Sequence, residues 1–120
     1  MVVINIPTQD KKNAGNQDDS GHEILDILEI SREEDQRGAV DALFHEKKST
    51  LLKALMDREK TIIDLQDELG ENPGTIKRLL DDLLATGLVV QSRTAVNNYG
   101  ITEKFYRAKA RRFTIRIEWP

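Results

Sequence analysis

Basic side chains gather toward the end of the sequence, where they could contact a polyanion. Between positions 93 and 112 the chain has six Lys and Arg residues and a single acidic residue, Glu103. Such cations neutralise phosphates, and the residues around a turn can reach the backbone or the minor groove of a duplex. The side chains expected to make these contacts are Arg93, Asn97, Asn98, Tyr99, Lys104, Arg107 and Lys109. The alternative is a solvated strand edge whose charges only keep the protein in solution.

A second group of polar residues follows Asn72 and Pro73, which are typical of a helix N-cap and first turn. If the helix enters a major groove, its first turns face the base edges. Glycine permits close approach, Lys or Arg pairs with guanine N7 and O6, and Thr reaches a phosphate or a thymine methyl. The residues predicted to do so are Gly74, Thr75, Lys77 and Arg78. The alternative is a solvated helix face, which Asp81 and Asp82 favour because carboxylates repel phosphates.

The sequence has no motif that predicts catalysis or metal binding. His22 and His45 are the only histidines, they lack metal-ligand spacing with carboxylates, and cysteine is absent. No phosphate-binding glycine loop and no nucleophile motif is present. The carboxylates at positions 18–26 are interpreted as an acidic linker and helix start rather than a cation site. We therefore expect no enzyme activity, no cofactor and no identifiable small-molecule ligand.

Length and charge limit the remaining classes. The 120 residues correspond to one domain, and 32% of them are charged. No apolar run approaches the roughly 18 residues that cross a bilayer, and no export signal is visible, so we expect a cytoplasmic protein without membrane contact. Residues 1–92 have 11 Lys and Arg against 19 Asp and Glu, whereas residues 93–120 have seven against two. This asymmetry favours local contact with a polyanion over general adhesion to anionic surfaces.

The first half of the chain is predicted to be a flexible segment followed by helices. Residues 1–7 are β-prone and residues 8–20 are polar, so residues 1–19 are expected to form a flexible N-terminal segment. Capping-box patterns at Ser20 with Glu23 and at Ser31 with Glu34 predict helices at 21–29 and 33–44. The second would bury Val40, Leu43 and Phe44, and a third helix at 48–57 would bury Leu51, Leu52 and Leu55.

Residues 61–86 have the pattern of two helices joined by a short turn. Gly70 is expected to end the first helix, and Gly87 to end the second, which starts at Pro73. Residues 88–110 then have the two-residue periodicity of strands, which predicts a β-hairpin, and residues 113–119 are expected to form a terminal strand. The side chains expected to be buried change from even-numbered to odd-numbered positions near Arg111 and Arg112. Since side chains alternate with a period of two along a strand, this change requires a break there. The terminal strand would pair with residues 1–6 or with a second chain.

These elements predict a mainly α fold with a small antiparallel β-wing, an α+β winged helix-turn-helix over residues 20–120, in which residues 61–86 are the helix-turn-helix and 88–110 the wing. The sequence resembles the ArsR-type (arsenic-repressor-like) regulators of small prokaryotic and archaeal kind over residues 40–113. The similar segments are ALFHEKK at 42–48, RLLDDLLATGLV at 78–89 and FYRA at 105–108. Metal sensors of that family have a cysteine motif before the turn, and residues 61–69 contain none.

The resemblance implies a sequence-specific regulator of transcription that binds double-stranded DNA. Winged helices also serve as protein-docking modules, so the alternative is an interaction module whose acidic first third or apolar last strand binds a larger assembly. We expect a homodimer, because a palindromic site needs two recognition helices. Its contact surface would come from residues 21–29, residues 33–44 or the final strand.

Overall fold

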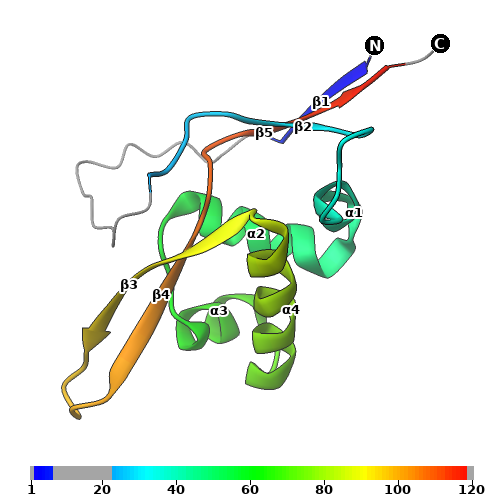
Figure 1. Cartoon of the computed structure of the whole chain (residues 1–120). Coiled ribbons are helices and arrows are strands. Elements are labelled where there is room, and N and C mark those ends of the chain that lie inside the picture. Colours follow the sequence, from blue (N-terminus) through cyan, green and yellow to red (C-terminus); the bar gives the residue numbers. More distant parts are fainter. Residues whose placement is uncertain (1, 7–22, 119–120) are drawn as a thin grey trace.

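Helices and strands are arranged in an α+β fold, as predicted. The computed structural model describes residues 2–6 and 23–118, and these form four helices and five strands. In chain order they are β1 (Val2–Ile6), β2 (Leu28–Ser31), α1 (Ala39–Phe44), α2 (Glu46–Asp57), α3 (Ile62–Leu69), α4 (Pro73–Thr86), β3 (Val89–Val96), β4 (Thr102–Ala108) and β5 (Phe113–Ile117). Figure 1 shows the helices below a sheet of β1, β5 and β2, with the β3–β4 hairpin extending to one side.

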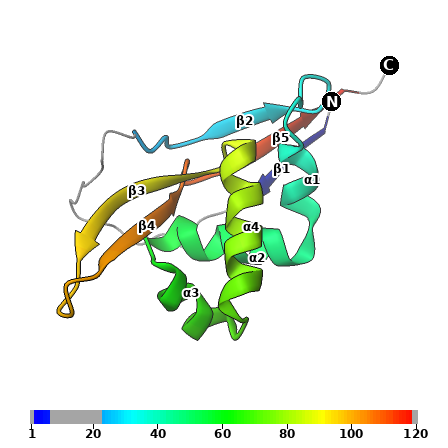
Figure 2. The same cartoon turned by 60° about the horizontal axis from the view of Figure 1, so that its bottom comes forward.

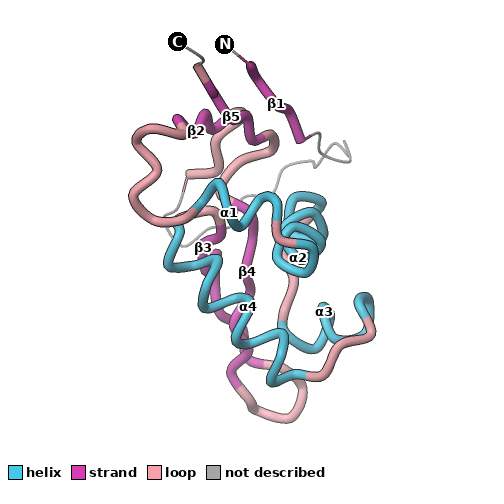
Figure 3. The backbone as a smooth tube through the Cα atoms, turned by 90° about the vertical axis from the view of Figure 1, so that its right-hand side faces the viewer, coloured by secondary structure: helices cyan, strands magenta, loops and turns pink. Residues whose placement is uncertain are grey.

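The terminal strand β5 lies in the middle of the three-stranded sheet. It pairs antiparallel with β1 and parallel with β2, and Phe113 is opposite both Ile6 and Leu28. Of the two partners that the sequence allows, the N-terminal strand is therefore the one observed. Residues 2–6 belong to this sheet rather than to a flexible segment. The predicted linker at 8–20 lies outside the described residues. Figure 3 shows the sheet at the opposite end of the molecule from the hairpin turn.

The helix boundaries from residue 45 onward follow from side-chain caps. His45 accepts a hydrogen bond from the Lys48 N–H at the start of α2 (3.2 Å). A reciprocal capping box of Thr61 and Asp64 starts α3, and Gly70 ends it at φ +70°. The Asn72 side chain accepts from Thr75 N–H (2.8 Å) to start α4. The predicted boundaries of both helices at 61–86 are confirmed.

The helix predicted at 21–29 is wrong for the residues that the structure describes. Leu28–Ser31 is strand β2, and Leu25 forms an isolated parallel bridge with Ala110. The Leu28 N–H donates to the Arg112 carbonyl (2.9 Å), which continues the pairing along β5. The alternation of apolar and polar residues at 28–31 matched a strand, but its partner lies more than 80 positions away. The local spacing of apolar residues therefore favoured a helix, but pairing with the distant strand β5 makes this segment a strand.

The helix predicted at 33–44 is shorter than expected, because α1 begins only at Ala39. Gly38 precedes it in the left-handed region at φ +76°, which interrupts a helix. The Asp35 carboxylate accepts from the Ala39 and Val40 N–H groups (2.9 and 3.0 Å) and so caps the helix from a loop. Phe44, predicted to be buried, is 60% exposed.

The core lies between the helices, the base of the hairpin and β5. Its largest fully buried side chains include Leu51, Leu55, Leu65, Leu80 and Phe113. Tyr106, Ala108 and Ala110 are buried on even positions, whereas Phe113 and Ile115 are buried on odd positions. The predicted break at 111–112 is therefore confirmed. No helix of the described residues is long and apolar enough to cross a membrane.

Candidate nucleic-acid interface

The amino-terminal end of α4 and the turn of the β3–β4 hairpin point toward the same end of the molecule, as Figures 1 and 2 show. The hairpin pairs antiparallel from Val89 opposite Ala108 to Val96 opposite Thr102, with an irregularity between Gln91 and Arg93. It confirms the strand pair predicted at 88–110. The two groups of residues singled out in the sequence are thus on elements that can face one ligand together.

The exposed start of α4 presents the four predicted residues. Gly74 is exposed, and a Cβ built there would meet only the Asn72 Oδ1 at 3.5 Å. The half-buried Thr75 follows, and Arg78 is exposed with no hydrogen bond or ion pair within the described part of the chain. Lys77 is exposed too, but its ammonium pairs with the Asp81 carboxylate (3.0 Å). Arg78 is therefore the side chain of α4 most available to a ligand.

The acidic residues around α4 have lysine partners. Residues 61–86 contain six Asp and Glu against two Lys and Arg, which would oppose a polyanion. However, Lys77 pairs with Asp81, Lys48 of α2 pairs with Asp82 (3.3 Å), and Lys47 pairs with Glu71 (3.1 Å). Each of these exposed pairs contributes little to stability. Their effect is to reduce the negative potential beside Arg78.

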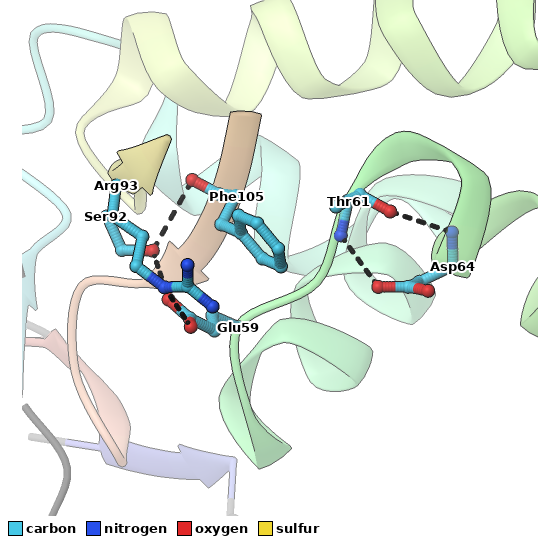
Figure 4. Close-up of polar contacts among 6 residues, drawn as sticks. All are labelled: Glu59, Thr61, Asp64, Ser92, Arg93 and Phe105. Carbon is cyan, nitrogen blue, oxygen red and sulfur yellow. Dashed lines mark hydrogen bonds and ion pairs between the residues drawn. The ribbon is translucent and has the colours of Figure 1, made fainter. Parts of the chain in front are cut away.

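Arg93 holds the base of the hairpin instead of presenting a free charge. Its Nε donates to Glu59 Oε2 (2.7 Å), and its guanidinium lies 3.9 Å from the centre of the Phe105 ring. The buried Ser92 hydroxyl donates to the other Glu59 oxygen (2.7 Å). Figure 4 shows Glu59 below Ser92 and Arg93, with Phe105 between them and the start of α3. Glu59 therefore fixes the hairpin to the segment between α2 and α3.

A backbone bridge strengthens this attachment. Lys60 and Tyr106 exchange both backbone hydrogen bonds at 2.9 Å, so residue 60 adds a short edge to the hairpin. The Lys60 side chain is almost fully buried, and its ammonium contacts Glu68 Oε1 of α3 (2.6 Å). The orientation of the hairpin relative to α3 is thus fixed by two ionic contacts and a strand pair.

At the hairpin turn, Asn97 is structural, whereas its neighbours are exposed. The Asn97 Oδ1 accepts from the N–H groups of Tyr99 (2.8 Å) and Ile101 (3.0 Å), as in an Asx-turn. Gly100 completes the turn at φ +76°. Asn98 is exposed, and Tyr99 is 86% exposed. The turn therefore presents Asn98 and Tyr99 outward.

The remaining predicted cations differ in their availability. Lys104 is exposed and has no ion pair among the described residues. Lys109 donates a hydrogen bond to the Glu23 carbonyl (3.1 Å). Arg107 is half-buried, and its side chain is already engaged in an interaction within the protein. The structure thus brings Asn98, Tyr99 and Lys104 to the exposed part of the hairpin, while Arg93, Asn97 and Lys109 support the fold. The partner of Arg93 is 34 positions away in the sequence, and no local pattern could reveal it.

A groove that the sequence did not predict separates α3 and α4 from the hairpin. Its volume is about 410 Å³, and it is lined by Thr61, Ile62, Ile63, Lys77, Asn97, Ile101, Thr102, Glu103, Lys104 and Tyr106. Burial raises the pKa of Tyr106, with smaller opposing effects from Lys77, which lowers it, and Asp81, which raises it. The Tyr106 hydroxyl therefore keeps its proton at neutral pH.

Comparison with known proteins identifies no family. No protein-family model matches the sequence, and no curated protein aligns with it significantly. The function is therefore inferred from α4, the hairpin and the groove between them.

Proposed function

We propose that this chain is a winged helix-turn-helix protein that binds double-stranded DNA in a sequence-specific manner and regulates transcription. In this proposal α3 and α4 are the helix-turn-helix and the β3–β4 hairpin is the wing. The observation that carries it is that α4 starts at the same end of the molecule as the hairpin turn (Figures 1 and 2). The second turn of α4 contains the exposed Arg78, which has no ion pair among the described residues. A duplex lying across this end would contact both elements.

The start of α4 is the part that would read sequence. A B-DNA major groove, about 12 Å wide, admits a helix whose first turns face the base edges. Arg78 would pair with guanine N7 and O6, and Thr75 would contact a phosphate or a thymine methyl. Gly74 would let the backbone approach closely, because its side of the helix start is open. Asp81 and Asp82 lie one turn further along and keep their lysine partners.

The hairpin would contact the sugar-phosphate backbone or the minor groove. Asn98 and Tyr99 lie at its turn, and Lys104 follows on the returning strand. Lys104 supplies charge without sequence information, since ammonium groups contact phosphates of any sequence. Reading and charge neutralisation are thereby assigned to different elements.

We further propose that the protein acts in the cytoplasm. It would bind DNA as a homodimer, because a palindromic site places two recognition helices about one helical turn apart. The final strand, which the sequence offered as one pairing surface, is flanked on both edges by β1 and β2 and is unavailable. Of the two other segments that the sequence offered, residues 21–29 expose Ile27 (52%) and residues 33–44 expose Phe44 (60%), so each has an apolar side chain that could contact a second copy.

A protein-docking module is the second candidate. It is favoured by the exposed apolar residues near the hairpin turn, Ile63, Val96, Tyr99 and Ile101, and by the excess of acidic residues at 61–86. The apolar face of the last strand cannot serve this role, because Phe113 and Ile115 are in the core. This candidate predicts no salt-dependent affinity for DNA.

Three variants test the DNA-binding proposal on duplexes selected from a random pool, measured by fluorescence anisotropy. Arg78→Ala should reduce discrimination between selected and altered sites by about 1–3 kcal/mol. Lys104→Ala removes one cation from each protomer of the dimer, so it should weaken all duplexes alike and make the salt slope shallower by about 2. Arg32→Ala, in an exposed arginine near the three-stranded sheet, is the control and should bind as the wild type does. Equal weakening of every duplex by Arg78→Ala would refute its reading role. Absence of salt-dependent binding in the wild type would support the docking candidate.

A further inference from the structure

The groove between α3, α4 and the hairpin has the properties of a small-molecule site. Its volume of about 410 Å³ lies within the range of ligand pockets, roughly 300–1,000 Å³. Ile63 and Ile101 line it from α3 and from the hairpin turn, and they remain 58% and 59% exposed. Ile62 adds a third apolar side chain. The intramolecular packing thus leaves an apolar surface uncovered on both walls.

The inner wall of the groove contains the hydroxyl of the buried Tyr106, a hydrogen-bond donor that has no partner among the described residues. Tyr106 is only 4% exposed, and its hydroxyl makes no hydrogen bond with any described residue. Buried polar groups are nearly always hydrogen-bonded to protein or to water, so this hydroxyl is available to a partner that enters the groove. Since the hydroxyl stays protonated at neutral pH, it is a donor and suits an oxygen acceptor.

The cations on the groove favour an anionic acceptor. Lys77 lies on the α4 side, close enough to the Tyr106 hydroxyl to influence its titration, and Lys104 lies on the hairpin side. Lys104 has no ion pair within the described residues, whereas Glu103 receives a long hydrogen bond from Asn97 Nδ2 (3.4 Å). An anion near Tyr106 would therefore meet the Lys104 ammonium and the Lys77 ammonium within the same groove, and it would share Lys77 with Asp81.

We propose that this groove binds a small apolar carboxylic acid. Its carboxylate accepts a hydrogen bond from the Tyr106 hydroxyl and lies near the Lys77 ammonium, and its apolar body covers Ile62, Ile63 and Ile101. Inorganic phosphate lacks that body and fits poorly. One consequence rests on the proposed function: an acid bound between α4 and the wing engages Lys77 and Lys104, so it lowers the affinity for DNA.

Binding is tested on the full chain by a ¹⁵N–¹H NMR titration with phenylbutyrate. We expect shifts confined to amides that line the groove, about tenfold weaker binding of the neutral amide of the same acid, and no groove shifts with inorganic phosphate. Tyr106→Phe keeps the ring and should weaken binding several-fold. Ile101→Ser should weaken it as well, whereas Val96→Ser, which changes an exposed valine of β3 that does not line the groove, should not. The spectrum of each free variant verifies its fold.

Each contrary result overturns one part of this proposal. Absent shifts at millimolar phenylbutyrate, or shifts elsewhere, overturn the site. Equal binding of the amide overturns the carboxylate assignment, and undiminished binding by Tyr106→Phe overturns the role of the hydroxyl. The anisotropy assay is then repeated with phenylbutyrate: unchanged DNA affinity overturns only the coupling. If the protein binds no DNA at all, the NMR titration still decides whether the groove is a site.

Discussion

Replacing Glu59 with alanine should loosen the base of the hairpin. This carboxylate accepts hydrogen bonds from Ser92 Oγ and from Arg93 Nε, both at 2.7 Å, and thereby joins β3 to the segment between α2 and α3. The Glu59 side chain is 20% exposed, the Arg93 side chain is 38% exposed, and Ser92 is 2% exposed. The two contacts therefore differ in how much water can replace the lost carboxylate.

The expected loss of stability follows from that difference. A hydrogen bond to a charged group contributes about 1.5–3 kcal/mol, and this applies to the buried Ser92 hydroxyl. The half-exposed Arg93 can be rehydrated, so its part is discounted to about 0–1 kcal/mol. We expect Glu59→Ala to lower the free energy of unfolding by about 2–3 kcal/mol.

Urea denaturation followed by circular dichroism measures this change. With an m-value of about 1.5 kcal/mol/M, the midpoint should fall by about 1–2 M. Glu34→Ala is the matched control, because Glu34 is exposed and its side chain makes no hydrogen bond or ion pair within the described residues, so its effect should stay within about 0.5 kcal/mol. A double-mutant cycle with Ser92→Ala should give a coupling of about 1 kcal/mol or more. A change no larger than that of the control, or zero coupling, would refute the anchoring role.

Three other substitutions have expected outcomes in the same denaturation assay. Glu68→Gln leaves the buried Lys60 ammonium beside a neutral partner and should cost about 1–3 kcal/mol, which Lys60→Met in the same chain should largely restore; no restoration would contradict the ion-pair explanation. Asp35→Ala removes both side-chain caps of α1 and should cost about 1–2 kcal/mol, whereas Asp35→Asn should cost less. Gly70→Ala has open space for its Cβ but a φ of +70°, so it should cost about 1–2 kcal/mol through backbone strain alone, and a neutral effect would disprove that reason.

The sequence predicted best the elements whose ends are determined locally. Asn72 with Pro73 starts α4 and Gly70 ends α3 through contacts within a few residues, so their patterns are visible in the sequence. The change from even-numbered to odd-numbered buried positions near residue 111 likewise follows from strand geometry alone.

What could not be predicted depends on distant partners. Leu28–Ser31 is a strand because β5 offers it an edge to pair with, and no local feature of these four residues reveals that edge. Arg93 has the composition of a phosphate contact, yet Glu59 and Phe105 hold it. The groove lined by Tyr106 arises where α3, α4 and the hairpin meet, so periodicity within one element gives no sign of it.

The most direct test of the DNA-binding proposal is the affinity of the wild-type chain for selected and scrambled duplexes at 50 and 200 mM salt. Arg78 and Lys104 of each protomer would give a dimer about four cations at the duplex, so log Kobs should fall with log salt at a slope of about −3.5, on the order of a hundredfold across this range. The selected duplex should remain tighter at both concentrations. Equal affinity for both duplexes would contradict sequence reading, and absence of binding at the lower salt would contradict the proposal as a whole.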